Sequence, residues 1–295
     1  YIGQLTLGHR PEPTSAEQTI VIDARPYPIE GIESLARELV ALHRQGWRKF
    51  AVLHCHGHRF IGNGFGPETE DVHMDVFGSV GDYLGSGSDG MTLVMHGNGQ
   101  DQIGQIHKCG TLVVHGDVGQ CYGYGAKGGE LFVLGNAAGR PMINSVGSPK
   151  LVVNGTALDY LAESFMAGDP LEGGGFVVIN GIRINGRGEV EELETPYPGG
   201  NLFSLSSGGA IYVRDPRRVL SDSQLNGAAF TELSQADWDV VEPLLMKNEA
   251  HFGITLARLL TVEGEIRAPA DVYRKIIPLK NKALSVEDSW AAKHD

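Results

Sequence analysis

Short apolar runs that end in glycine recur along the chain at nearly constant spacing. The closing glycines are Gly57, Gly78, Gly97, Gly116, Gly135, Gly155 and Gly181, and three successive intervals between 78 and 135 are each 19 residues. An eighth run, residues 210–215, follows after a long insertion. A period near 19 with one strand in each repeat predicts a parallel β-solenoid, because each coil then adds one strand to the coil before it.

The repeat therefore indicates an all-β fold. We expect a right-handed parallel β-helix with one strand per coil and about seven to eight coils of about 19 residues, spanning residues 49–216. Residues 1–48 are expected to form a small α/β cap, and residues 217–295 a C-terminal helical segment and tail. In the cap, residues 18–24 are predicted to form a strand and residues 34–45 a helix that Ser34 caps.

Alignment of the runs on their last glycine predicts which side chains face inward. Side chains alternate between the two faces of a strand, so positions two and four before each glycine share one face. These positions are apolar in every run, which predicts two stacked ladders that fill the solenoid. The ladders comprise Cys55, Val76, Met95, Val114, Val133, Val153, Ile179 and Val213, and Leu53, Met74, Leu93, Leu112, Leu131, Leu151, Val177 and Ile211.

The outward face also carries an apolar stripe, which a solvated face would not. Either the chain's own helices or another subunit must cover it. We interpret the stripe, with two histidines that stack in adjacent coils, as a candidate subunit interface. Its members are Val94, Val113, Phe132, Val152, Val178, His96 and His115.

Two clusters spell G-x-G-x-x-G, a spacing that occurs in dinucleotide-binding loops. They lie 38 residues apart, two periods of the repeat, at Gly85, Gly87 and Gly90 and at Gly123, Gly125 and Gly128. A dinucleotide loop opens a helix, whereas the run GELFVLG after Gly128 predicts another strand. We therefore interpret these glycines as structural corners, where the chain needs positive φ angles or close backbone approach.

The C-terminal part predicts a helix from Ser234 to about Phe252, ended by Gly253, and a short second helix capped by Thr255. Beyond Pro269 a tail is expected, anchored by Tyr273, Ile276 and Ile277. These helices are candidates to cover part of the outward stripe.

Candidate catalytic chemistry is sparse. His54, His56 and His58 alternate as H-x-H-x-H, a possible metal arrangement, but Gly57 turns the chain before His58 and no carboxylate or cysteine joins the pattern. Cys121 has no base placed beside it. We assign no catalytic, cofactor-binding or metal residue, and a metal site at the three histidines stays an alternative hypothesis of the enzyme class.

Composition excludes several partners. The formal charge of −12 argues against nucleic acid. No apolar run approaches the roughly 20 residues of a membrane span. Scattered cysteines without a C-x-x-C pair fit a reducing cytoplasm. The chain begins at Tyr1 rather than methionine, so trimming of the N-terminus stays open.

The corners GSVGDYLGSGSDG and GDVGQCYGYGAKGG resemble the GXGXG domain that closes the large subunit of glutamate synthase. Three further stretches are similar to the stand-alone, archaeal-type form of that domain: VIDAR with its following helix, RFIGNGFG, and HFGITLARLL followed by YRKIIPL. The resemblance covers residues 18–280. The coil GRPMINSVGSPKLVVNG lacks the G-x-G corner, and an insertion at residues 182–207 replaces the last corner.

The resemblance implies a non-catalytic scaffolding subunit of a cytoplasmic redox complex in glutamate biosynthesis. The implied partners are a glutamine amidotransferase-like subunit and an FMN/iron–sulfur synthase-like subunit in a hetero-oligomer, with FMN and iron–sulfur clusters on those partners and no cofactor on this chain. The alternative is a solenoid subunit of another flavin or iron–sulfur complex or of a formyl-transfer complex, similar to formylmethanofuran dehydrogenase C or N-methylglutamate synthase.

Overall fold

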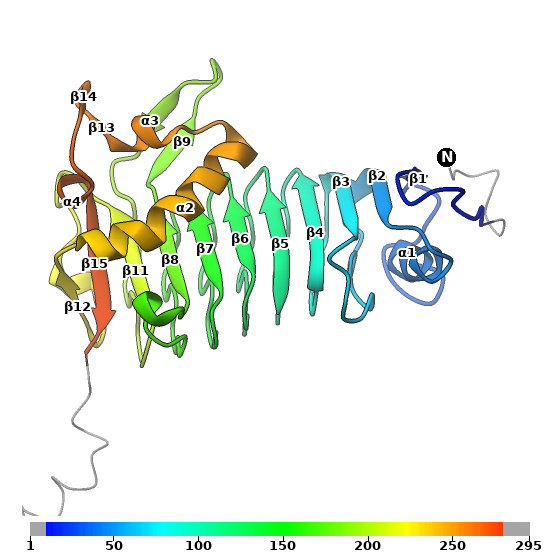
Figure 1. Cartoon of the computed structure of the whole chain (residues 1–295), viewed down its shortest axis with the longest axis horizontal. Coiled ribbons are helices and arrows are strands. Elements are labelled where there is room, and N and C mark those ends of the chain that lie inside the picture. Colours follow the sequence, from blue (N-terminus) through cyan, green and yellow to red (C-terminus); the bar gives the residue numbers. More distant parts are fainter. Residues whose placement is uncertain (1–9, 280–295) are drawn as a thin grey trace, which may run out of the picture.

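The computed structural model describes residues 10–279, and one sheet of 11 strands organises them (Figure 1). The strands follow each other in the order β1-β2-β3-β4-β5-β6-β7-β8-β11-β15-β12. Pairing is parallel from β1 to β11. The parallel strands are β1 Thr19–Asp23, β2 Lys49–His56, β3 His73–Ser79, β4 Asp89–His96, β5 Cys109–Val114, β6 Glu130–Val133, β7 Lys150–Val153, β8 Phe176–Ile179 and β11 Ala210–Arg214.

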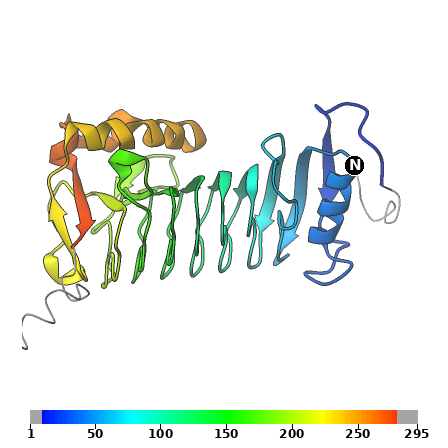
Figure 2. The same ribbon diagram turned by 60° about the horizontal axis from the view of Figure 1, so that its bottom comes forward.

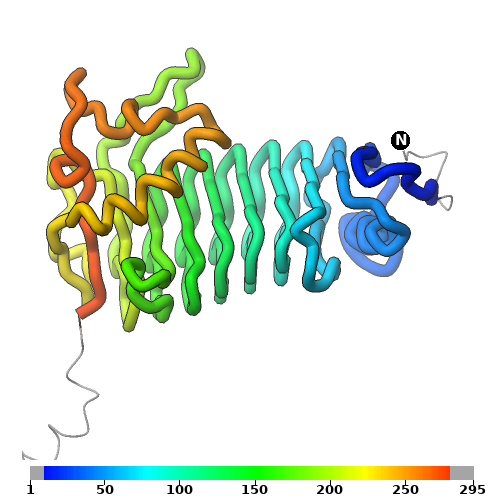
Figure 3. The backbone as a smooth tube through the Cα atoms, in the orientation of Figure 1, coloured from blue at the N-terminus to red at the C-terminus, as the bar shows by residue number. Residues whose placement is uncertain are grey.

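The path of the chain confirms the predicted parallel β-solenoid with one strand per coil (Figure 3). The seven strands from β2 to β8 define about six regular turns, slightly fewer than the seven to eight expected. The insertion after β8 forms an antiparallel hairpin, β9 Ile182–Ile184 and β10 Val190–Glu192, before the chain returns to the sheet as β11.

Two apolar ladders fill the interior, and every side chain in them is at most 1% exposed. Burial of each such side chain is worth roughly 1.5–3 kcal/mol, most of which offsets the entropy lost on ordering. The strand register gives the ladders as Phe50, Met74, Leu93, Leu112, Leu131, Leu151, Val177 and Ile211, and as Val52, Val76, Met95, Val114, Val133, Val153, Ile179 and Val213.

The ladder positions of the first coil differ from the predicted ones. A bulge shifts the register of β2 between Val52 and Cys55, where His54 takes a φ of 58°. Consequently Phe50 and Val52 occupy the ladder positions that the alignment gave to Leu53 and Cys55. Leu53 is only half-buried, so its inward assignment is wrong. Cys55 pairs with Gly78 of β3, outside the ladder, but it is 5% exposed and belongs to the core as predicted.

The corners of the coils repeat a left-handed backbone conformation at every second residue. In one coil it falls on Cys121, Gly123 and Gly125, with φ of 57°, 67° and 62°. The amide of Cys121 donates to Gly139 O in the following coil at 2.9 Å, that of Gly123 to Ile103 O in the preceding coil at 2.8 Å, and that of Gly125 again forward, to Ile143 O at 2.8 Å. The alternation therefore bonds each corner to both of its neighbours.

Coils without glycines at these positions keep the same corner, which falls at residues 140–144, 160–164 and 201–205. Arg140, Met142 and Asn144 have φ of 61°, 60° and 58°, and their amides donate forward, backward and forward at 2.8, 2.7 and 2.9 Å. A left-handed conformation costs a non-glycine residue about 1–3 kcal/mol. Hydrogen bonding between coils thus enforces the geometry where the sequence lacks glycine.

The third glycine of each G-x-G-x-x-G cluster serves a different purpose. Gly90 has a φ of 122°, but Gly128 does not take a positive φ. Instead, a Cβ on Gly128 would lie 2.4 Å from the carbonyl oxygen of Lys108 in the preceding coil. The chain continues from Gly128 into β6 rather than into a helix.

The N-terminal segment closes one end of the solenoid (Figure 2). Strand β1 pairs with β2, and helix α1 (Leu35–Arg44) buries Leu35, Leu39 and Leu42, the face that the sequence predicts. Ser34 stands at the N-cap but makes no side-chain capping bond.

The C-terminal segment extends the same sheet. The expected tail beyond Pro269 is instead a short helix α4 (Pro269–Val272) and a strand β15 (Tyr273–Pro278), which pairs antiparallel with both β11 and β12 (Ala228–Thr231). Of the expected anchors, Tyr273 and Ile276 are buried and Ile277 is half-buried. Helix α3 (Leu256–Leu260) begins at Thr255 as predicted and leads into a small hairpin, β13 Thr261–Val262 and β14 Glu265–Ile266. In residues 10–279, no helix has both the length and the apolarity to cross a bilayer.

Helix α2 (Gln235–Phe252) lies along the outward face of the sheet (Figures 1 and 2). Its N-terminus is a capping box in which Ser234 and Asp237 bond each other's backbone amides, and Gly253 ends it with a φ of 72°. Four apolar side chains of α2 pack into one cluster with the strands beneath: Trp238, Val241, Leu244 and Leu245.

Buried polar contacts fix the position of α2 on the sheet. The side chains of Asn248 on α2 and Asn154 after β7 exchange two hydrogen bonds of 2.9 and 3.0 Å, and neither residue is more than 1% exposed. At the other end of the helix, Asp237 accepts from the Tyr212 hydroxyl at 2.8 Å and from Lys275 Nζ at 2.6 Å. Because unpaired buried polar groups are costly, these contacts specify one docked position.

We predict that Gly128→Ala destabilises the protein more than Gly87→Ala. The first change forces a Cβ against a backbone oxygen and should cost about 3 kcal/mol, whereas Gly87 has no heavy atom within 4 Å of its Cβ position and should cost about 1 kcal/mol, for its left-handed φ alone. Urea unfolding of the two variants measures the difference, and equal losses would contradict the close-approach role of Gly128.

We predict that Asn248→Leu lowers the free energy of unfolding by about 1–3 kcal/mol, because one buried N–H of Asn154 loses its acceptor. Asn154 keeps its hydrogen bonds with Val133 O and Asn180. Lys247→Leu is the matched control, since it removes only an exposed ion pair with Glu130 and should change stability by less than about 1 kcal/mol. Thermal unfolding measures both. Indistinguishable melting temperatures would show that the asparagine pair does not fix α2.

Candidate functional site

Helix α2 leaves the N-terminal part of the outward sheet face uncovered. We call the outward side chains of β3 and β4 the open face. Phe77 is 38% exposed there, and the side chains of His73, Asp75 and His96 are between 31% and 45% exposed. The open face comprises His73, Asp75, Phe77, Thr92, Val94 and His96.

Aromatic rings stack along the open face as far as α2. Phe77 and His96 are nearly parallel, with ring centroids 4.3 Å apart and planes 7° apart. His115 stacks on His96 at 5.0 Å, which confirms the expected contact between these two histidines, and Phe252 at the end of α2 packs edge-on against His115 at 5.1 Å. The stack therefore runs from the covered part of the sheet into solvent.

Asp75 orients the imidazoles at the exposed end of the stack. Its Oδ1 lies 2.7 Å from His96 Nε2, and its Oδ2 lies 2.9 Å from His73 Nε2. One carboxylate thus contacts two imidazoles, which lie on neighbouring strands. Sequence analysis missed Asp75 and His73, although their alternation on one strand with Phe77 was a usable signal.

The covered stripe is core and is not open to a partner. Val113, Phe132, Val152 and Val178 are fully buried beneath α2, while Val94 is only half-buried. The sequence left two coverings open, the chain's own helices or another subunit, and for these four side chains the covering is the chain itself. The interpretation as a subunit interface is corrected for them, and Val94, His96 and His115 stay at the margin of the open face.

The three alternating histidines do not converge. His58 is buried, with Nε2 3.2 Å from Tyr27 O and Nδ1 accepting from the His56 amide, so it holds the corner together. The Nδ1 of His54 lies 3.3 Å from Asp23 Oδ1. Within residues 10–279, no group of three or more histidine, cysteine, aspartate or glutamate side chains is arranged to hold a metal ion.

A buried serine–histidine pair lies inside one corner. Ser88 Oγ is 2.6 Å from His107 Nδ1, but the two residues are only 6% and 0% exposed. Burial lowers the pKa of His107, and a substrate cannot reach the pair.

Cys121 is not activated as a nucleophile either. Burial raises the pKa of its thiol, and a protonated thiol is a weak nucleophile.

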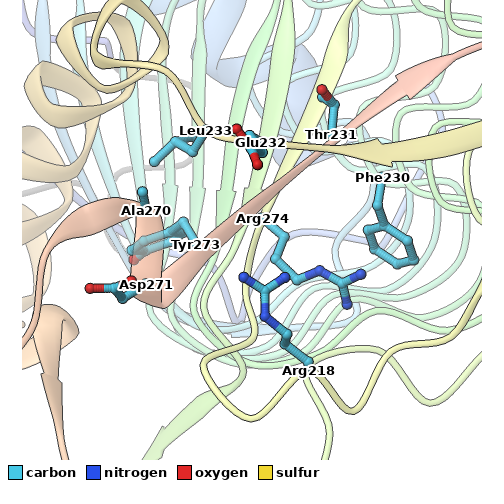
Figure 4. A pocket seen from close by; sticks show the side chains of 9 residues that line it. All are labelled: Arg218, Phe230, Thr231, Glu232, Leu233, Ala270, Asp271, Tyr273 and Arg274. Carbon is cyan, nitrogen blue, oxygen red and sulfur yellow. The ribbon is translucent and has the colours of Figure 1, made fainter.

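A hollow of about 450 Å³ lies beside β12 and the start of β15 (Figure 4). One of the two arginines that line it is already engaged, because Arg274 stacks 3.5 Å from the Phe230 ring and donates to Asp215 Oδ2 at 2.9 Å. The other, Arg218, is exposed to solvent. The Tyr273 hydroxyl donates to Asn180 at 2.8 Å. These contacts join the C-terminal strands, so we assign the hollow a structural role.

Stability should fall on mild acidification. Burial lowers the pKa of His115 and of His251, and the neighbouring His96 lowers that of His115 further. The folded state then binds fewer protons than the unfolded state near pH 6, so their contribution to stability is full above about pH 6.5 and declines below it.

We predict that the double variant His115→Gln, His251→Gln has a shallower loss of stability between pH 7.5 and pH 5.5 than the parent. Urea unfolding at both pH values measures it. Asp75 faces His115, and Glu130 and Lys247 face His251; these groups stay in place. A residual slope is expected from His107 and His43, whose pKa values burial also lowers. An unchanged slope would contradict this account.

A known protein family matches this sequence. The model of the family described as "GXGXG motif" matches residues 52–261 of the 295 in the chain. The matched range contains the regular coils, the corner repeat and helix α2. No curated protein matches the sequence. Since the match spans well over half of the chain and the corners have the repeat that gives the family its name, the chain belongs to the GXGXG motif family.

Proposed function

We propose that this chain is a non-catalytic scaffolding subunit of a cytoplasmic, glutamate-synthase-like redox complex. In this proposal an amidotransferase-like partner releases ammonia from glutamine and an FMN/iron–sulfur partner uses it. The chain holds them through broad surface contacts. Membership of the GXGXG family supports the glutamate-synthase-like assignment.

The open face is the observation that carries the proposal. It presents a stacked phenylalanine and histidine on the sheet, and Asp75 holds the histidine by a contact of 2.7 Å. Aromatic residues in a preorganised position contribute strongly to interfaces because little entropy is lost when a partner covers them. Helix α2 covers the continuation of the same face within the chain, which indicates that this surface accepts a packed element.

In this proposal the chain itself binds no cofactor, and FMN and the iron–sulfur cluster belong to the partner subunits. Cys55 lies in β2, Cys109 in β5 and Cys121 in the corner that follows β5. No group of three or more potential metal ligands among residues 10–279 includes them, which is consistent with a cluster held elsewhere. If the chain instead belongs to a formyl-transfer complex or to another flavin or iron–sulfur complex, its partner subunits would carry the prosthetic groups of that complex.

We predict that Phe77→Asp releases the partner subunits while the chain stays folded, because Phe77 is partly exposed and sits outside the interior ladders. Ile184→Asp is the matched control, with 39% exposure against 38% for Phe77. Tagged chains are purified from the native source, and the co-eluting glutaminase activity, flavin and iron are quantified.

The parent and Ile184→Asp should retain all three signals, and Phe77→Asp should lose most of them while keeping its β circular dichroism. Equal retention in both variants would contradict docking at the open face. If the parent complex contains neither flavin nor glutaminase activity, the glutamate-synthase-like assignment is contradicted. If that complex also contains molybdenum or a formyl-transferring activity, the formyl-transfer alternative is favoured.

A further inference from the structure

A groove of about 500 Å³ lies at the N-terminal end of the solenoid, away from the open face. One wall is helix α1, which contributes Arg37, Val40 and Arg44, and the other is the corner of the first coil, with Phe60 and Gly64. The closure of the solenoid end by α1 thus creates a surface that the repeat itself does not have.

The groove is electropositive on a strongly acidic protein. The whole chain carries a formal charge of −12, yet no carboxylate lines the groove and two arginines do. Arg37 and Arg44 are exposed, and neither makes a side-chain hydrogen bond or ion pair with any residue between 10 and 279. Two carboxylates line the adjoining hollow on the other side of Arg37, Glu33 and Glu38, and Glu38 is already bound by Arg10 at 2.8 Å.

Apolar surface continues from the groove past the start of α1. Ile32 is 82% exposed and Ile29 is 50% exposed, and Gly31 between them lines the groove. Exposed large apolar side chains that adjoin unpaired arginines are typical of protein interfaces, which are enriched in arginine and poor in other charges at their centre.

The spacing of the arginines favours a protein segment over a small molecule. Seven residues separate Arg37 from Arg44, so their Cα atoms lie about 10 Å apart along the same side of the helix. Both guanidinium groups are at the exposed rim, whereas a small-molecule site encloses most of its ligand. A helix with carboxylates seven residues apart and apolar side chains between them matches this spacing.

We propose that the α1 groove binds an acidic, amphipathic helix of a partner protein. Its apolar side chains pack on Val40 and Phe60, and its two carboxylates pair with Arg37 and Arg44. This contact is separate from the open face and has its own test, so either proposal can fail while the other stands.

The probe is a blocked, fluorescent helical peptide with two glutamates seven residues apart and leucines between them. Fluorescence anisotropy is measured with the full chain, the double variant Arg37→Glu, Arg44→Glu, and a charge-matched control, Arg187→Glu, Arg218→Glu, whose arginines are also exposed and unpaired among residues 10–279. Circular dichroism confirms that both variants are folded.

Binding to the parent and the control should be equal, should weaken with salt, and should fall at least tenfold in the α1 variant. A peptide with glutamine in place of glutamate should bind at least tenfold more weakly to the parent. No detectable binding, equal binding to all three proteins, or equal binding of the glutamine peptide would overturn the proposal.

Two further outcomes would also overturn it. If glutarate displaces the peptide at equal concentration, the groove is a small-dicarboxylate site. If sedimentation shows a concentration-dependent dimer of the parent that the α1 variant loses, the occupant is a second copy of this chain.

Discussion

Hydrogen bonds between successive coils at the corners are the constraint on which the rest of the structure depends. A corner residue in the left-handed conformation sends its amide to one neighbouring coil, and the next such residue sends its amide to the other. Every coil is thereby fixed at the same height and rotation as its neighbours. Together with the backbone pairing of the strands, this regularity keeps the inward ladders in register over the whole sheet.

Regular stacking also produces a continuous outward face of the sheet. Part of this face is apolar, and leaving those side chains exposed to water would be unfavourable. Helix α2 covers the apolar half, held by the asparagine pair and by Asp237. The stacked rings of Phe77, His96 and His115 mark the boundary where this covering stops. We infer that the uncovered half is the surface that a scaffolding subunit would use.

The sequence predicted what depends on local pattern. The period of 19 residues, the inward ladders from Met74 onward and the caps of α2 follow from spacing and residue type alone. The bulge in β2 did not, because Leu53 and Val52 are equally apolar and only the pairing with β3 distinguishes them. The corner at Arg140, Met142 and Asn144 was also unpredictable, since inter-coil bonds rather than glycine impose its left-handed backbone.

The candidate site was predicted only in part. The stacking of His96 on His115 followed from their positions in the repeat. The C-terminal helices were candidates to cover part of the outward stripe, and α2 does cover Val113 and Phe132. The sequence did not distinguish this covering from one by another subunit, because it does not relate a helix at 235–252 to strands more than a hundred residues earlier. The role of Asp75 required the side-chain geometry.

Amide hydrogen exchange in the native protein, resolved by NMR, tests the corner mechanism most directly. The amides of Met142 and Asn144 donate to the coils on either side, as do those of Gly123 and Gly125. If inter-coil bonding enforces the corner, all four amides should exchange at similarly slow rates, close to those of the sheet. Fast, loop-like exchange at Met142 and Asn144 with slow exchange at the two glycines would show that glycine, and not the bonding between coils, makes the corner.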